Sequence, residues 1–111
     1  MVVTPENELF RIIVDRICKI YGDNVVSIIL YGSTARGEAT DESDIDLAII
    51  IKSDDRQMYD QWLDSVVLLN LEYDQLICTS RIEKEKFDTW KNVLPYYQNI
   101  EKEGIVLWKA A

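Results

Sequence analysis

The sequence predicts an α/β fold, in which helices flank a small mixed β-sheet, and three observations lead to this expectation. Two short runs of apolar and β-branched residues, 25–31 and 45–51, have the composition of buried strands. Segments whose apolar residues recur at helical spacing precede and follow these runs. The chain has 111 residues, of which 48% are hydrophobic, enough for one core and too few for two. We therefore expect a single domain over residues 1–111.

The first element is predicted to be a helix that ends at Gly22. Thr4 and Pro5 have the pattern of an N-cap followed by proline at the first helical position, and Gly22 that of a C-cap. Between them, apolar residues stand at helical spacing at Leu9, Ile12, Ile13, Ile17 and Ile20. The two strand-like runs come next along the chain.

The second half of the chain is expected to add helices and two more strands. In order, we predict a helix from Asp54 or Asp55 to about Leu69, a third strand over 71–78 and a helix over 81–93 that Pro95 interrupts. A further helical stretch with Tyr96, Tyr97 and Ile100 should end at Gly104, and an edge strand should follow over 105–108.

The lengths of the connections constrain how the strands are arranged. Only residues 32–44 separate the first two strands, which is short for a parallel crossover and favours an antiparallel pair. A whole helix separates the second and third strands, which favours a parallel pair with a right-handed crossover. The end of the first strand and the starts of the other two should therefore meet at one edge of the sheet.

Acidic residues are predicted to gather at that edge. Asp44 and Asp46 stand two residues apart in an extended segment, so their side chains share a face, and Asp74 lies early in the predicted third strand. Three close carboxylates repel each other, by roughly 4 kcal/mol per pair at 4 Å and an effective dielectric near 20, unless a cation joins them. Oxygen ligands suit Mg²⁺ or Mn²⁺, and two such ions about 4 Å apart can catalyse nucleotidyl transfer.

Gly32 and Ser33 are the candidate phosphate-binding residues. A glycine lets the backbone approach a phosphate closely, and the following amides and the Ser33 hydroxyl can donate hydrogen bonds to it. Arg36 is the one base between Ser33 and Asp46, where it can contact a phosphate or pair with Asp41 or Glu42. A site for nucleotidyl transfer is favoured by the order of these features along the chain, which is an apolar strand, Gly-Ser, ten residues and then Asp-x-Asp.

Composition excludes several other kinds of function. The net charge is −8, and residues 38–80 hold eleven acidic side chains against two basic ones, so we expect no direct binding of nucleic acid. The absence of histidine excludes histidine-based zinc sites and Ser-His-Asp catalysis. Without a signal-peptide pattern or an apolar run of about 20 residues, we expect a cytoplasmic protein with no membrane contact. Cys18 and Cys78 are predicted to be buried free thiols.

Two segments carry a family resemblance. Residues 31–37, YGSTARG, and 43–47, SDIDL, resemble the minimal nucleotidyltransferases (MNT) of the DNA polymerase β-like superfamily. The signature of that family is Gly-Ser, ten residues and Asp-x-Asp, and this chain matches it without a gap. Residues 100–108, IEKEGIVLW, also look like the end of these domains. The resemblance implies the polymerase β-like nucleotidyltransferase fold.

The resemblance also implies roles for individual residues. Asp44 and Asp46 would be catalytic and bind magnesium, Gly32 and Ser33 would hold the nucleotide phosphates, and a later strand would provide a third acid. For this third acid Asp74 is expected, with Glu72 as its rival. Small members of the family are often antitoxins, of the type VII kind, encoded beside a HEPN ribonuclease toxin, and they transfer AMP from ATP to a tyrosine of that toxin. A HEPN toxin would then be the partner, in a hetero-oligomer.

Two other functions stay open at this point. The domain can be a binding module that masks its partner by stable association, with the acidic site secondary. It can also be a nucleotidyltransferase for small molecules, with its acceptor site completed by a homodimer. Nucleotide preference, acceptor residue, general base and stoichiometry are not fixed by the sequence.

Overall fold

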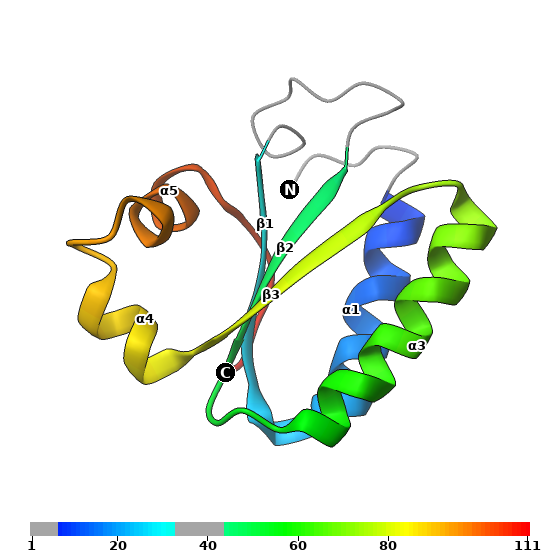
Figure 1. The fold of residues 1–111 in the computed structure, drawn as a ribbon, viewed down its shortest axis with the longest axis horizontal. Helices are drawn as coiled ribbons and strands as arrows, with labels where there is room; N and C mark the ends of the chain where they lie inside the picture. Colours follow the sequence, from blue (N-terminus) through cyan, green and yellow to red (C-terminus); the bar gives the residue numbers. More distant parts are fainter. Residues whose placement is uncertain (1–6, 33–43) are drawn as a thin grey trace.

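A mixed sheet with the strand order β3-β2-β1-β4 forms the centre of the computed structural model, which describes residues 7–32 and 44–111 (Figure 1). Helices α1 and α3 lie against one face of this sheet, and α4 and α5 lie against the other (Figure 1). The elements are α1 (Asn7–Tyr21), the 3-10 turn η1 (Gly22–Asn24), β1 (Val25–Tyr31), β2 (Ile45–Ile51), α3 (Arg56–Tyr73), β3 (Ile77–Glu83), α4 (Lys84–Trp90), α5 (Pro95–Glu103) and β4 (Ile105–Lys109).

The strand directions confirm the predicted topology. β1 and β2 are antiparallel, with Leu30 opposite Leu47, and β2 and β3 are parallel, with Ile45 opposite Ile77. β4 pairs with β1 and forms an edge of the sheet, as expected. The end of β1 and the start of β2 therefore meet at one end of the sheet, next to the start of β3.

The larger core lies between the sheet and helices α1 and α3. Alternate residues of β2, starting at Ile45, point into it, and Trp62 of α3 is fully buried there. On the opposite face a smaller cluster joins Ala48 and Ile50 of β2 to α4 and α5 through Phe87 and Ile100. Each fully buried aliphatic or aromatic side chain stabilises the fold by about 1.5–3 kcal/mol. The α1–α3 face thus supplies most of the stability.

Local signals in the sequence account for several helix ends. Asp55 is the N-cap of α3, because its carboxylate accepts a hydrogen bond from the Met58 amide at 3.0 Å, and Pro95 is the first residue of α5. Gly22 follows α1 with a left-handed φ of 54°, which glycine adopts without strain. The expected N-cap at Thr4 and Pro5 lies outside the described residues.

The predicted third strand over 71–78 is wrong. Helix α3 continues through Leu71 to Tyr73, Asp74 ends it in a left-handed conformation with φ 52°, and β3 begins only at Ile77. Leu71 and Leu76, whose apolar character favoured a strand, are 78% and 53% exposed. They belong to a helix surface and a connection, not to the core. The helix predicted from Arg81 begins only at Lys84, because residues 81–83 still belong to β3.

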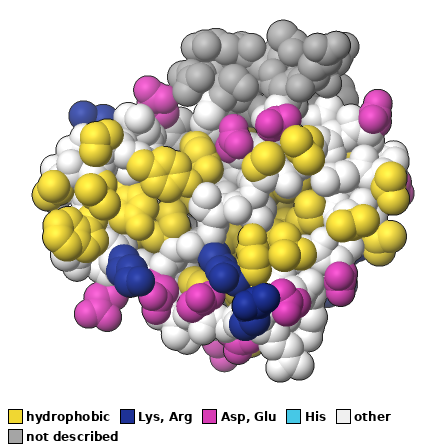
Figure 2. Space-filling model, in the orientation of Figure 1, with side chains coloured by type: hydrophobic (Ala, Val, Ile, Leu, Met, Phe, Trp, Pro, Cys, Tyr) yellow, Lys and Arg dark blue, Asp and Glu magenta, His cyan; other side chains and the backbone are white. Residues whose placement is uncertain are grey.

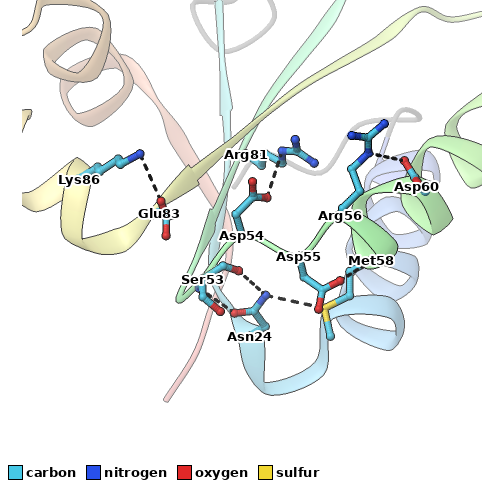
Figure 3. A network of polar contacts seen from close by, with 10 residues as sticks. All are labelled: Asn24, Ser53, Asp54, Asp55, Arg56, Met58, Asp60, Arg81, Glu83 and Lys86. Carbon is cyan, nitrogen blue, oxygen red and sulfur yellow. Dashed lines mark hydrogen bonds and ion pairs between the residues drawn. The ribbon is translucent and has the colours of Figure 1, made fainter.

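A network of polar contacts closes the end of the sheet where β2 leads into α3 (Figure 3). The Asn24 side chain donates to the Ser53 carbonyl at 2.8 Å and accepts from the Ser53 amide at 3.0 Å. Asp54 forms an ion pair with Arg81 at 3.3 Å, and the Arg81 guanidinium lies over the Tyr59 ring, 3.8 Å from its centroid. The acidic side chains at this end therefore have structural partners.

Two further expectations concern cysteines and membranes. Cys18 and Cys78 are free thiols, as predicted, but both are half-buried rather than fully buried. Within residues 7–32 and 44–111, no helix is both long and apolar enough to cross a membrane.

Candidate active site

The candidate site lies where β1 ends and β2 begins. Tyr31 and Asp46 face each other across this antiparallel pair, and Gly32 follows directly. A Cβ added at Gly32 would lie 2.5 Å from Oδ2 of Asp46, and the φ of Gly32 is +77°. Both observations require glycine here, because any larger residue would displace the Asp46 carboxylate and strain the backbone. The structure thus brings Gly32 and Asp46, the second residue of the Asp-x-Asp pair, together, as the sequence predicted.

The two aspartates repel each other at this edge. Asp44 is exposed and precedes β2, while Asp46 is half-buried within it. Burial raises the pKa of the Asp46 carboxyl, and the nearby charge of Asp44 raises it further. A cation between these carboxylates would remove the cause of that repulsion.

Cys78 is the neighbour of Asp46 on β3. The two residues are register partners in the parallel pair, so their side chains lie on the same face of the sheet. Burial, followed by the charges of Asp44 and Asp46, raises the pKa of the Cys78 thiol. The thiol is therefore held in its neutral form and is a poor nucleophile at this position.

A chain of hydroxyl groups lies on the same sheet face as Asp46. The Tyr31 and Tyr96 hydroxyls are 2.9 Å apart, and the Tyr96 hydroxyl donates to the Ser80 hydroxyl at 2.8 Å. Burial, and then the hydrogen bond with Tyr96, raises the pKa of Tyr31. The sequence analysis missed these three residues. The register of β1 against β2 could have pointed to Tyr31, which lies opposite Asp46. Tyr96 could not have been found in this way, because it reaches the site from α5 through tertiary packing.

The other predicted site residues fall in three places. Ser33 and Arg36 lie outside the described residues. Asp74 was expected in the third strand beside the aspartate pair, but it stands at the C-terminal end of α3, and its rival Glu72 is in the last turn of that helix. In the part of the chain that the structure describes, no three acidic or cysteine side chains form a group that could hold a metal. Among the described residues the expected cluster of three carboxylates is thus not formed, and Asp44 and Asp46 are the acids that stand at this end of the sheet.

This pair still provides the donors that a hard cation prefers. Magnesium is often bound by only one or two protein carboxylates, with the remaining ligands coming from water and substrate phosphates. Asp44 and Asp46 fit that pattern, because the charge of Asp44 acts on Asp46 and Asp44 is exposed to the solvent. The glycine beside them leaves room for the Asp46 carboxylate against the backbone.

Comparison with known proteins shows which family this chain belongs to. The model of the nucleotidyltransferase domain family matches residues 10–107, which include the whole candidate site. The chain belongs to this family. A relative from Methanocaldococcus jannaschii, named "putative protein adenylyltransferase", is 32% identical over 103 residues, which cover 93% of this chain and 98% of the relative.

Solved structures show the same fold at low sequence identity. A chain in the crystal structure of a toxin–antitoxin pair with AMP-PNP superposes with a TM-score of 0.53 and 20% identity, covering 86% of this chain and 73% of that one. A chain in the complex of a tri-AMPylated Shewanella oneidensis HEPN toxin with its MNT antitoxin gives a TM-score of 0.52 and 15% identity, with 93% and 72% covered. The sheet and its flanking helices are therefore those of the polymerase β-like nucleotidyltransferases.

Proposed function

We propose that this protein transfers AMP from ATP to a hydroxyl group, expected to be a tyrosine, of a HEPN toxin, and so acts as its antitoxin. The observation that carries the proposal is Asp46 beside Gly32, with the charge of Asp44 acting on Asp46, in a chain of the nucleotidyltransferase family. The name of the Methanocaldococcus relative and the AMP groups on the Shewanella toxin support the choice of a protein as acceptor.

Each residue of the site has a role in this proposal. Asp44 and Asp46 would hold magnesium, and Gly32, with Ser33 and Arg36, would bind the nucleotide phosphates. Magnesium, when bound, neutralises charge on the triphosphate and favours ionisation of the attacking hydroxyl. Manganese would fit the same ligands, and a second ion is expected.

The reaction is an in-line displacement at the α-phosphorus of ATP. The acceptor oxygen forms a new bond to this phosphorus while the bond to the bridging oxygen of the β-phosphate breaks. AMP remains on the acceptor, pyrophosphate leaves, and the hydroxyl proton is released. The position of the transferred phosphorus therefore distinguishes this reaction from transfer of the γ-phosphate.

The test is labelling of the product of the adjacent gene. With magnesium, label should pass to that protein from ATP labelled at the α-phosphorus and not from ATP labelled at the γ-phosphorus. The double variant Asp44→Asn, Asp46→Asn should lose at least about a thousandfold in rate, because it loses several kcal/mol of charge stabilisation. The matched control is Asp15→Asn, Asp88→Asn, which removes the same charge from two exposed i,i+4 ion pairs and should retain the rate.

A second function, masking of the partner without catalysis, is favoured by the exposed apolar side chains of this chain, among them Leu71 and Trp90. If the partner receives no label and the Asp44→Asn, Asp46→Asn variant still neutralises it, masking is correct and catalysis is wrong. If label appears on a small molecule with no partner present, the acceptor is not a protein.

A further inference from the structure

Four apolar side chains at the C-terminal end of α3 and just beyond it stand out on the surface. They are Val67, Leu68, Leu71 and Leu76, with exposed fractions of 58, 63, 78 and 53%, and we call them the α3 apolar patch. Figure 2 shows hydrophobic side chains reaching the surface on the side of the molecule where α3 lies. Exposed aliphatic groups gathered in this way mark an interaction surface more often than isolated ones do.

The patch has no role in the core of this chain. Val67 and Leu71 are four residues apart and Leu68 and Leu71 three apart, so they share one helix face. The opposite face of α3 already supplies the core with the buried Trp62, Val66 and Leu69. Within residues 7–32 and 44–111 the patch therefore has no covering element, which leaves it available to another molecule.

The patch reaches the edge of the sheet that carries the candidate active site. The Leu76 carbonyl accepts a hydrogen bond from the Ile45 amide at 2.8 Å, and Ile45 stands between Asp44 and Asp46 in the sequence. A protein bound to the patch would thus lie next to the aspartate pair.

The charges around the patch indicate what kind of surface it accepts. Residues 67–76 contain the exposed acids Glu72 and Asp74 and no base, and earlier in α3 Asp60 and Asp64 stand against one base, Arg56, which pairs with Asp60 at 3.6 Å. Helix α1, which packs beside α3, adds two acids and three bases, so acids still outnumber bases over the two helices. A second copy of this chain would place acids against acids in a twofold interface. A partner with lysine and arginine around its apolar side chains would instead be attracted.

We infer that the α3 apolar patch is the docking surface for the protein that receives AMP, and that this protein presents apolar side chains flanked by basic ones. The inference rests on the proposed function for the identity of the partner. The other exposed apolar group, on α4 and α5, lacks this charge preference, because residues 84–103 contain four acids and four bases. This group on α4 and α5 includes Trp90 and Val93 and is the alternative docking surface.

The test measures affinity apart from catalysis, with the purified product of the adjacent gene as the probe. Calorimetric titration compares the parent with Leu68→Gln, Leu71→Gln, two exposed positions where glutamine keeps the fold. We expect at least about a tenfold rise in Kd for this variant, and weaker binding by the parent at high salt. The matched control Val93→Gln, Val106→Gln removes two similarly exposed apolar groups elsewhere and should stay within about twofold of the parent.

A further variant separates this inference from the proposed function. Asp44→Asn, Asp46→Asn should bind the probe as the parent does while transferring nothing. Binding without transfer by the parent would contradict the proposed reaction and leave the docking surface in place. The docking surface is wrong if Leu68→Gln, Leu71→Gln binds like the parent, if only the control loses affinity, or if the parent does not bind the probe. It is equally wrong if sedimentation shows that the parent alone is a dimer and that Leu68→Gln, Leu71→Gln is a monomer.

Discussion

The two ends of strand β2 are both rich in aspartate, and they differ in what surrounds the carboxylates. After β2, Asp54 pairs with Arg81 at 3.3 Å and Asp55 caps α3 at 3.0 Å (Figure 3). Before and within β2, Asp44 raises the pKa of Asp46, and Gly32 leaves space for the Asp46 carboxylate. One end uses its carboxylates to hold the fold together, while at the other, burial and the charge of Asp44 disfavour the ionised form of Asp46.

This difference teaches that acidic composition does not identify a site by itself. The block over residues 38–80 has eleven acids, and only the arrangement around each one tells a helix cap or ion pair from a candidate ligand. Groups kept in an unfavourable environment are candidates for function, because the fold alone gives no reason for them. The experiments below compare the two ends of β2.

The largest difference is expected in the response to magnesium and nucleotide. A ligand at 100 times its Kd stabilises the folded chain by about 2.7 kcal/mol, which raises the Tm by several degrees in a domain of this size. Thermal unfolding of Asp44→Asn, Asp46→Asn should show no such rise. Asp54→Asn, Asp60→Asn, which removes the same charge at the other end of β2, should respond like the parent. If both variants respond equally, the ligand binds elsewhere.

The next largest effect is expected at Gly32. Alanine there should cost about 1–2 kcal/mol of stability for its positive φ, and its Cβ should push the Asp46 carboxylate out of place. Chemical denaturation measures the first effect, and the lost response to magnesium and ATP measures the second. Gly22→Ala is the matched control, since its φ is +54° and its Cβ would meet open space. It should lose similar stability and keep the ligand response, and a lost response in both variants would contradict a specific role for Gly32.

At the structural end of β2, Asp55→Ala should lower stability by about 1 kcal/mol, because the Met58 amide loses its capping partner. Urea denaturation measures this loss. The AMP transfer rate at a temperature where both proteins are folded should be unchanged. A variant with intact stability and impaired transfer would reverse the roles assigned to the two ends.

The smallest effect concerns pH in the metal-free protein. Because the pKa of Asp46 is raised in the folded state, the folded chain binds more protons than the unfolded chain between the ordinary carboxyl value of 3.8 and the raised value. Stability therefore falls as pH rises through this window and stays lower above it. In EDTA at pH 7, Asp46→Asn should have a higher Tm than the parent, and the difference should shrink below about pH 4. An equal or lower Tm at pH 7 would show that Asp46 is not under strain.

Much of the fold could be predicted because local signals and tertiary packing agree over most of the chain. The apolar runs of β1 and β2 and the short connection between them fixed an antiparallel pair, which in turn placed Gly32 beside Asp46. The third strand failed because Leu71 and Leu76 are apolar yet exposed, so their composition misrepresents their environment.

That error also misplaced the expected third ligand. Asp74 was assigned to the sheet because it followed Leu71, whereas it ends α3. The hydroxyl chain from Tyr31 through Tyr96 to Ser80 could not be predicted either, since it depends on how α5 packs against the sheet. Where several strands and helices meet, periodicity within one segment carries no information on the side chains of another.

The central claim is that Asp44 and Asp46, beside Gly32, form the metal–nucleotide site, and paramagnetic broadening by Mn²⁺ tests it most directly. In amide NMR spectra of the protein with ATP, substoichiometric Mn²⁺ should broaden the signals of Gly32 and Asp46 and leave those of Asn24 and Ser53, at the other end of the sheet, sharp. The Asp44→Asn, Asp46→Asn variant should show no local broadening. Broadening centred on Asp54, Asp55 and Asp60 instead, or unchanged in the variant, would contradict the claim.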